Sequence, residues 1–484
     1  MSLKPHEVWA PPLSPNRFEA VLEPGDWAEF RHILESSGNL LEGRAVWNVN
    51  STAQGGGVAE MLRSFTSYSR GAGLDMRWTA IEGTPEFFAV TKRLHNLLHG
   101  EPGDGGELGA RERDVYEAVT QGNAEELAAT VRPDDIVLLH DPQTAGLVSR
   151  LKDCGAVVVW RSHVGAELSN ELVDLAWDFL KPYLDGADAC VFSRHAYVPE
   201  WAVNRRTMVI QPSIDAFSPK NQDMDDGTAQ AILEHVGLLG AGGPQDATTT
   251  FTRSDGSPGR VDRHCDIISS GPPPGADMPL VTQVSRWDRL KDPVGVMLGF
   301  AEHACDGTEA RLVLAGPNVS GVADDPEGAA VFNEVTEAWR TLPHERCARV
   351  HLASLPMADI DENAAIVNAL QRHSAIVVQK SIQEGFGLTV AEAMWKSRAV
   401  VASAVGGIRD QVTNGETGVL LDDPHDLCRF GEAVRALLDD PVRRERLGRN
   451  AREHVRRNFL INRHARQYFE LLAAVLAEQG PDVR

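Results

Sequence analysis

The sequence predicts an α/β protein with two Rossmann-like domains, each built on a doubly wound parallel sheet. Short apolar runs alternate with stretches of helical spacing, which is typical of parallel strands joined by crossover helices. The alternation occurs twice, with an irregular segment between the two series. At 484 residues the chain is also too long for one hydrophobic core. We therefore expect two domains facing a cleft, because open α/β sheets bind ligands at the carboxyl ends of their strands.

The first series follows an N-terminal extension, residues 1–42, and makes up the predicted domain 43–225. Its first strand leads into a glycine run and then a stretch of helical spacing. Further apolar runs are predicted as strands, with helical stretches between several of them. The predicted strands lie at 44–50, 135–140, 156–163, 187–193 and 206–215. This succession indicates a parallel sheet with helices on its faces.

The second series makes up the predicted domain 279–462, and a linker with an insertion, residues 226–278, precedes it. That linker is rich in Gly, Pro, Ser and Asp and has no clean period, so we expect it to be partly mobile. The last segment, 463–484, is predicted as a C-terminal helix that could return to the N-terminal domain. The strands of the second domain are expected at 279–287, 310–316, 348–354, 374–381 and 397–403.

The composition narrows the classes of partner. The formal net charge is −22, which argues against nucleic acid or an anionic membrane but leaves room for a small anion in a local basic pocket. None of the six cysteines is spaced as Cys-x-x-Cys, so neither zinc nor a redox motif is indicated. The N-terminus has no apolar stretch of signal-peptide length, and no run of about 18 apolar residues occurs. We expect a cytoplasmic protein.

A glycine triplet follows the first predicted strand. Gly55, Gly56 and Gly57 remove three Cβ atoms where the chain turns into a helix, so backbone N–H groups can approach an anion there. The spacing is neither a Walker A loop nor Gly-x-Gly-x-x-Gly. An ordinary tight turn explains the triplet equally well, and the sequence leaves both interpretations open.

Polar residues end two further strands of the first domain. His140 and Asp141 follow one strand, and Arg161 and His163 follow the next. A single histidine is usually structural. Two polar clusters at the carboxyl ends of strands in one sheet are harder to explain that way, because charged groups at core-facing strand ends do not stabilise the fold. They indicate a ligand at this edge.

In the second domain Arg286 follows the first strand, and Lys291 comes five residues later. Two cations at one strand end suit a diphosphate, whereas the pair without further evidence would be interpreted as two solvated charges. A later strand ends near Lys380 and Glu384, and a glycine loop, a helix start and Glu392 come next. Loop N–H groups, a helix dipole and two carboxylates together would suit a phosphorylated sugar.

A local explanation for Glu392 also stands. Thr389 and Glu392 have the spacing of a capping box, in which the two side chains satisfy free backbone N–H groups. Metal ligands are not indicated, because the Asp-x-Asp spacings at 223–225 and 359–361 fit chance in so acidic a chain and His-Glu-x-x-His is absent. We expect no obligatory metal.

These motifs resemble those of retaining glycosyltransferases of the GT-B fold, in the large group called family four, and more specifically the trehalose glycosyltransferring synthases. The resemblance runs from about Val46 to about Tyr468, and the chain departs from it by an expanded stretch between Asp226 and Met278. The segments that carry it include "NSTAQGGGVAEML", "LLHDPQTAGLV", "VVWRSHVG", "SIQEGFGLTVAEAM" and "VGGIRDQVTNGETGVLL".

The resemblance implies a role for each candidate residue. Enzymes of this kind join glucose from a nucleotide-glucose to free glucose. The glycine triplet would face the donor phosphates, and Arg286 and Lys291 would neutralise the leaving diphosphate. Glu384, with the loop amides, would hold the donor glucose, and Glu392 would bind the ribose. His163 would lie beside the donor glucose at the reacting centre. The loop amides are those of Phe386, Gly387 and Leu388, and the acceptor-binding residues would be His140, Asp141 and Gln143.

The expected product is α,α-trehalose, from ADP-, UDP- or GDP-glucose and with the donor's configuration retained. Mg²⁺ would at most stimulate the reaction, and the resemblance implies a homodimer. Trehalose phosphorylases share much of this sequence and stay open as an alternative, with phosphate replacing the nucleotide. An NAD-dependent oxidoreductase is disfavoured by the missing Gly-x-Gly-x-x-Gly, and a non-catalytic sugar-nucleotide sensor by the intact Arg286, Lys291 and His163.

Overall fold

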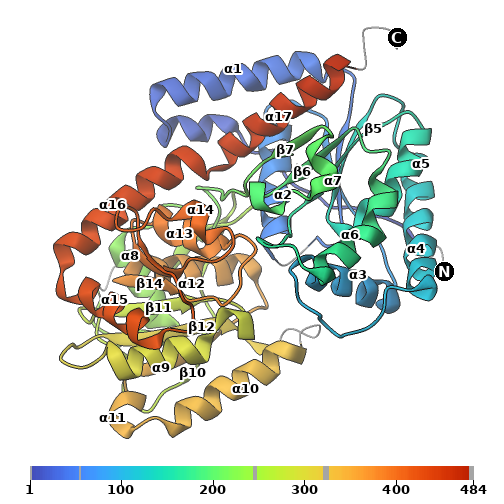
Figure 1. Cartoon of the computed structure of the whole chain (residues 1–484). Helices are drawn as coiled ribbons and strands as arrows, with labels where there is room; N and C mark the ends of the chain where they lie inside the picture. The colour runs from blue at the N-terminus through green and yellow to red at the C-terminus, as the bar shows by residue number, and fades with distance from the viewer. Residues whose placement is uncertain (1–2, 54–55, 244–247, 320–325, 479–484) are drawn as a thin grey trace. The chain divides into compact units, whose positions relative to one another are not determined.

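The structure is a computed structural model that describes residues 3–53, 56–243, 248–319 and 326–478. The chain folds as two units (Figure 1). Unit 1 contains Met1–Ser213 and Leu460–Arg484, and unit 2 contains Ile214–Phe459. Each unit has its own parallel sheet and its own buried core, so the predicted pair of α/β domains is confirmed.

The sheet of unit 1 has the order β1-β3-β2-β4-β5-β6-β7. All neighbours pair in parallel except β1, which lies antiparallel at the edge beside β3. The strands are β1 (His6–Glu7), β2 (Val46–Asn50), β3 (Met76–Ala80), β4 (Ile136–His140), β5 (Val157–Ser162), β6 (Ala189–Phe192) and β7 (Thr207–Val209). Successive strands are added on one side of β2 and then on the other, so the strand order reverses between β2 and β4. Such a switch point is where open α/β sheets bind ligands.

Helices cover this sheet. The core of unit 1 lies between the sheet and these helices and includes buried aromatic side chains such as Trp160 and Tyr116. The C-terminal helix α17 packs against α1 and α2 of the same unit, with an ion pair of 3.0 Å between Arg466 and Glu29 (Figure 1). The helices are α1 (Pro24–Leu40), α2 (Gly56–Gly71), α3 (Pro85–Leu98), α4 (Ala110–Ala128), α5 (Val148–Asp153), α6 (Glu171–Leu184), α7 (Glu200–Val203) and α17 (Ile461–Glu478).

The sheet of unit 2 has the order β10-β13-β12-β11-β14-β15-β16, with only β10 antiparallel. Its parallel strands follow the order 3-2-1-4-5-6 of a Rossmann sheet, so the switch point lies between β11 and β14. The strands are β10 (Asp266–Ile268), β11 (Leu280–Val284), β12 (Arg311–Pro317), β13 (Val350–Leu355), β14 (Ile376–Gln379), β15 (Ala399–Ser403) and β16 (Val419–Leu421). Most of their side chains are buried, as expected of strands covered on both faces.

The segment 226–278 is more ordered than its composition predicts. It contains α8 (Asp226–His235), which packs on α12 (Ile360–His373), and the hairpin of β8 (Thr250–Thr252) and β9 (Pro258–Arg260). It also contributes the edge strand β10. The hairpin turn is fixed to the start of α12, because Arg253 pairs with Asp359 at 2.7 Å and Ser254 donates to Asp361 at 2.6 Å. These tertiary partners lie about a hundred residues away, so the local sequence carries no signal of them.

The remaining helices of unit 2 surround its sheet, with α15 packed on α9 and α13 on α16 (Figure 1). Within the part of the chain that the structure describes, no helix is both long and apolar enough to cross a membrane. The helices are α8 (Asp226–His235), α9 (Pro293–His303), α10 (Pro326–Thr341), α11 (His344–Cys347), α12 (Ile360–His373), α13 (Leu388–Trp395), α14 (Ile408–Gln411), α15 (Leu427–Asp439) and α16 (Pro441–Asn458).

Candidate active site

The switch point of unit 2 brings together two loops that carry predicted site residues. The loop after β11 holds Arg286 and Lys291, and the loop after β14 holds Glu384. Because β11 and β14 are paired neighbours, their carboxyl ends meet at the same edge of the sheet. A backbone hydrogen bond of 2.8 Å from Ile382 N to Leu290 O joins the two loops.

Lys291 and Glu384 form an ion pair at this edge. The Lys291 Nζ lies 2.6 Å from Glu384 Oε2, and both side chains are largely shielded from solvent. The same carboxylate oxygen accepts a hydrogen bond from Ser381 Oγ at 3.2 Å and a longer one from Gln379 Nε2 at 3.5 Å. Gln283 Nε2 in turn donates to the Lys291 carbonyl at 2.7 Å. The polar residues that end β11 and β14 therefore fix both partners of the pair.

A second ion pair supports the first. Lys380, which has no exposed surface, pairs with Asp292 and also donates to the Pro424 carbonyl at 2.5 Å. Asp292 has a φ of 48° and caps α9, where its carboxylate accepts from Gly295 N at 3.0 Å. A buried lysine needs such a partner, because an unpaired charge in the interior is costly. Lys380 thus anchors the residue that follows Lys291.

Arg286 lies on the same loop with a different ionic partner. Its guanidinium is 3.0 Å from Asp288 Oδ2, and its side chain is 62% exposed. The structure therefore joins Lys291 to Glu384, whereas the ion pair of Arg286 is with Asp288. An exposed arginine can reorient toward an anionic ligand at little cost, since exposed ion pairs contribute at most about 1 kcal/mol.

The glycine loop after Glu384 is built around its backbone. Gly387, at φ 82°, is the N-cap of α13, which begins at Leu388. The described residues give no hydrogen bond to the N–H groups of Phe386, Gly387 or Leu388. These donors precede and open a helix, which is the arrangement that binds anions elsewhere in proteins. These unpaired donors at a helix start are the groups that the predicted donor-binding role of the loop requires.

The capping-box interpretation of Glu392 is wrong. Gly387, not Thr389, is the N-cap, and no side chain caps this helix end. Glycine takes the position because its φ is in the left-handed region, where a threonine would be strained. Glu392 is only 5% exposed, and its carboxylate lies 3.6 Å from the Lys220 ammonium. Lys396, one turn later, donates to the Glu392 carbonyl at 3.1 Å.

A second glycine motif supports the loop from behind. Gly407 N donates to Gly385 O at 3.0 Å, and Gln411 Nε2 donates to Phe386 O at 2.5 Å. A Cβ at position 407 would lie 2.6 Å from the Phe386 Cα, so only glycine allows this approach. Sequence reasoning quoted the "VGGIRD" segment for its resemblance alone and assigned it no role. The adjacent glycines were the available signal.

In unit 1 the predicted polar residues converge at the carboxyl ends of β4 and β5, next to the switch point between β2 and β4. His140 ends β4, and His163 follows β5. His140 Nδ1 lies 3.1 Å from His163 Nε2, with the two rings nearly parallel. Asp141 Oδ1 accepts from the His163 backbone N–H at 2.7 Å. The structure thus brings His140, Asp141 and His163 together, as predicted from strand ends.

Asp141 holds an unusual backbone conformation, with φ 66°. Its N–H donates to Arg161 O at 2.7 Å, and its carbonyl accepts from Trp160 Nε1 at 3.1 Å. Burial raises the pKa of the Asp141 carboxyl to about 7, although the His163 N–H and the Arg161 charge oppose the shift. A strained residue at a strand end is a frequent property of functional sites.

A buried arginine lies beside the two histidines. Arg161 is 1% exposed, donates to Tyr468 Oη at 2.7 Å and to Ile210 O at 3.0 Å, and lies against His464. Burial and this positive charge lower the pKa of His140 to about 3 and that of His163 well below its usual value. Tyr468 and His464 belong to α17, some 300 residues away, so sequence reasoning missed them.

The remaining predicted residues of unit 1 have simpler surroundings. Gln143 lies in the 3₁₀ turn after β4, and its Oε1 is buried without a hydrogen-bond partner among the described residues. Gly56, at φ 78°, and Gly57 open α2 after β2. Gly55 lies outside the described residues. Asn48 of β2, which sequence reasoning missed, is fully buried and bonds His140 at 3.2 Å.

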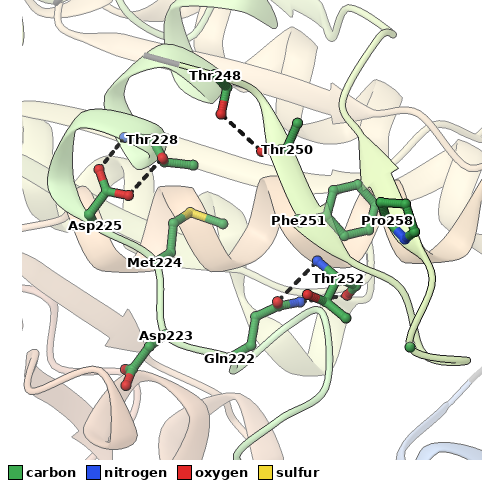
Figure 2. Close-up of a pocket in the computed structure, with 11 residues that line it drawn as sticks. Gln222, Asp223, Met224, Asp225, Thr228, Thr248, Thr250, Phe251, Thr252 and Pro258 are labelled. Atoms are coloured by element: carbon green, nitrogen blue, oxygen red, sulfur yellow. Dashed lines mark hydrogen bonds between the residues drawn. The ribbon is translucent and has the colours of Figure 1, made fainter. Parts of the chain in front are cut away.

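A hollow of about 860 Å³ occurs in unit 2 between residues 222–228 and the β8–β9 hairpin (Figure 2). It is lined by threonines, Phe251 and the carboxylates of Asp223 and Asp225, and by none of the predicted site residues. In the described ranges, no three His, Cys, Asp or Glu side chains gather as they would around a metal ion.

Comparison with known proteins places these features in a family. The sequence model described as "Trehalose synthase, N-terminal domain" matches residues 48–199, and that of "Glycosyl transferases group 1" matches residues 352–454. The chain is 34% identical to a trehalose synthase of Rubrobacter xylanophilus, over 92% of this chain and 93% of the relative.

A more distant relative and a solved structure are also similar to this chain. A trehalose phosphorylase of Pleurotus pulmonarius is 24% identical over 84% of this chain, which spans 54% of that protein. The fold is similar to that of a UDP-forming α,α-trehalose-phosphate synthase of Burkholderia xenovorans, with a TM-score of 0.65 at 14% identity, covering 90% of this chain and 99% of the other. This chain belongs to the trehalose synthase family, glycosyltransferases with the GT-B fold.

Proposed function

We propose that this chain is a retaining glycosyltransferase that joins glucose from an NDP-glucose to free glucose and releases α,α-trehalose and NDP, reversibly. The observation that carries the proposal is the Lys291–Glu384 pair at the switch point of unit 2, next to a glycine loop with unused N–H groups. A cation, a carboxylate and loop amides are the groups that a sugar diphosphate requires. Membership in the trehalose synthase family supports the choice of product.

On the donor side, Lys291 and Glu384 pair with each other in the free enzyme. When the donor binds, each side chain would leave this ion pair and contact the donor instead. Lys291 and Arg286 would neutralise the diphosphate, with the N–H groups of the Phe386–Leu388 loop adding positive potential. Glu384, held by Ser381, would accept hydrogen bonds from glucose hydroxyls. Glu392 would take the ribose hydroxyls, with its carboxylate 3.6 Å from the Lys220 ammonium. The nucleotide would be ADP, UDP or GDP.

On the acceptor side, the polar cluster of unit 1 would bind free glucose. His140, Asp141 and Gln143 would contact acceptor hydroxyls, for which the unpartnered Gln143 Oε1 is a ready hydrogen-bond acceptor. His163 would lie beside the donor glucose, and the glycine triplet Gly55–Gly57 would face the donor phosphates.

The transfer itself would proceed on one face of the donor glucose. The acceptor's anomeric hydroxyl attacks the donor's anomeric carbon while the bond from that carbon to the diphosphate oxygen breaks. The acceptor proton passes to an oxygen of the departing phosphate, and NDP leaves. Catalysis would then come from positioning and from stabilising the charge that grows on the leaving group. We also propose that the protein works in the cytoplasm as a homodimer.

Phosphorolysis of trehalose is the second candidate, because a trehalose phosphorylase matches most of this chain. In that reaction inorganic phosphate would occupy the site of the nucleotide's phosphate. An assay separates the two candidate reactions: purified protein is incubated with glucose and either NDP-glucose or glucose 1-phosphate, and trehalose is measured. Trehalose formed from NDP-glucose supports the synthase, whereas trehalose formed only from glucose 1-phosphate selects the phosphorylase.

A further inference from the structure

A line of hydrogen bonds crosses four neighbouring strands of unit 1 and ends at His163. It begins at Met76 of β3, whose sulfur lies 3.1 Å from Asn48 Nδ2 of β2. Asn48 Oδ1 lies 3.2 Å from His140 Nε2 of β4, and His140 Nδ1 lies 3.1 Å from His163 Nε2 after β5. All four side chains are buried, His163 being the most exposed at 9%.

The direction of each bond follows from its chemistry. A thioether sulfur can only accept, so the Asn48 amide must turn its NH₂ group toward Met76 and its oxygen toward His140. That oxygen can only accept, so His140 carries its proton on Nε2. A neutral imidazole has one proton, which leaves His140 Nδ1 as an acceptor. His163 must therefore donate from Nε2, and its own Nδ1 carries no proton.

The surroundings keep both imidazoles neutral. The positive charge of Arg161 and the burial of the rings disfavour protonation of either histidine. His464, from α17, is a further group near His163, and burial and Arg161 lower its pKa as well. The Asp141 carboxylate bonds the His163 backbone N–H. The described residues give His163 Nδ1 no hydrogen-bond partner.

We propose that Asn48 and His140 are positioning residues that hold His163 as the Nε2–H tautomer, so that its bare Nδ1 accepts a hydrogen bond from a sugar hydroxyl. The second part rests on the proposed function, whereas the tautomer itself does not. A site with an acceptor and no donor at this point selects a hydroxyl-bearing sugar, because an analogue lacking that hydroxyl would leave Nδ1 unpaired. Asn48 would thereby contribute to sugar selectivity without touching the sugar.

Nitrogen-15 NMR of the substrate-free enzyme tests the tautomer directly, since protonated and bare ring nitrogens resonate far apart. The chain has 16 histidines, so the signals of His140 and His163 are assigned by their disappearance in His140→Gln and His163→Gln. We expect a proton on Nε2 and none on Nδ1 in both rings. A proton on His163 Nδ1 in the wild-type protein overturns the proposal, whatever reaction the enzyme catalyses.

Substitutions of Asn48 test its control over His163. Asn48→Leu removes the acceptor, so we expect a mixture of tautomers at His163, while Asn48→Asp keeps an acceptor and should preserve the Nε2–H form. The matched control is Asn50→Leu, because Asn50 is also buried, lies two residues along the same strand and bonds Trp78 at 2.9 Å. Its His163 signals should match those of the wild type. An unchanged tautomer in Asn48→Leu contradicts the proposal.

Kinetics supply the second readout. A series of NDP-glucose and glucose analogues, each lacking one hydroxyl, is compared in wild type and Asn48→Leu. We expect kcat/KM for the parent sugars to fall about tenfold, the value of one hydrogen bond of about 1.4 kcal/mol, and discrimination against one analogue to shrink by a similar factor. If the His163 tautomer changes in Asn48→Leu but the variant discriminates against every analogue as the wild type does, the proposed hydrogen bond between a sugar hydroxyl and His163 Nδ1 is wrong. If no substrate is turned over at all, the failure lies with the proposed function, and the NMR result still decides the tautomer.

Discussion

Replacing Lys291 by methionine tests the leaving-group model while keeping the length of the side chain. In the free enzyme the substitution leaves Glu384 with Ser381 and Gln379 as its donors and without a cation at 2.6 Å. Breaking a fully buried ion pair costs about 3–5 kcal/mol, and this pair retains some exposure, so we expect a loss of about 2–3 kcal/mol in the free energy of unfolding. On catalysis, the loss of one positive charge beside the diphosphate should lower kcat about a hundredfold, or about 2.7 kcal/mol of transition-state stabilisation.

The two effects can be separated by a second substitution. Lys291→Met combined with Glu384→Gln removes the unpaired carboxylate, so stability should partly recover while activity stays low. Stability is measured by urea unfolding, and kcat by NDP release at saturating donor and glucose. Arg286→Ala should also lower kcat about a hundredfold. Arg289→Ala is the matched control, because Arg289 is similarly exposed (55%, against 62% for Arg286) on the same loop but pairs with Glu334. Near-normal kcat in both Lys291→Met and Arg286→Ala would refute the assignment.

Three further predictions concern other parts of the molecule. Glu392→Ala should weaken binding of free NDP, measured by calorimetry, at least tenfold through the loss of charged hydrogen bonds to the ribose; unchanged affinity would remove Glu392 from the site. Exhaustive EDTA treatment should slow turnover without abolishing it, because protein cations would carry the leaving-group charge, and complete loss restored only by Mg²⁺ would contradict this. The pKa of His140, lowered to about 3 from 6.5, means that the unfolded chain binds a proton the native state does not, so the free energy of unfolding falls as the pH drops below about 6.5. His140→Asn should flatten that slope by up to about 1.4 kcal/mol per pH unit, and equal slopes in urea unfolding would argue against the shift.

The alternation of strands and helices was sufficient to predict the two parallel-sheet units. The central strands of both sheets are buried on both faces, so their apolar runs stand out in the sequence. The edge strand β10 could not be found this way, because its pairing with β13 is set by tertiary contacts and not by its own composition. The same holds for the order of strands, which decides that β11 lies beside β14.

Strand ends were also a good guide to the candidate site. His140, Asp141 and His163 do converge, as do Lys291 and Glu384, because parallel strands present their carboxyl ends at one edge. Direct partners across long separations were not predictable. Asn48 lies within an apolar strand, and Tyr468 lies on a helix 307 residues from Arg161, so neither carries a local mark of its contact. The capping-box prediction was wrong because Gly387, in the left-handed conformation, is the N-cap of α13, so Thr389 lies inside the helix.

The central claim is tested most directly by carbon-13 NMR of the product that the purified protein forms from NDP-glucose and glucose. The account predicts α,α-trehalose, whose symmetry gives a single set of glucose signals, together with release of one NDP per disaccharide. Because the donor glucose is α-linked, an α configuration at both anomeric carbons of the product shows that the donor's configuration is retained. A maltose-type or β-linked product would contradict the proposed reaction while leaving the glycosyltransferase family intact.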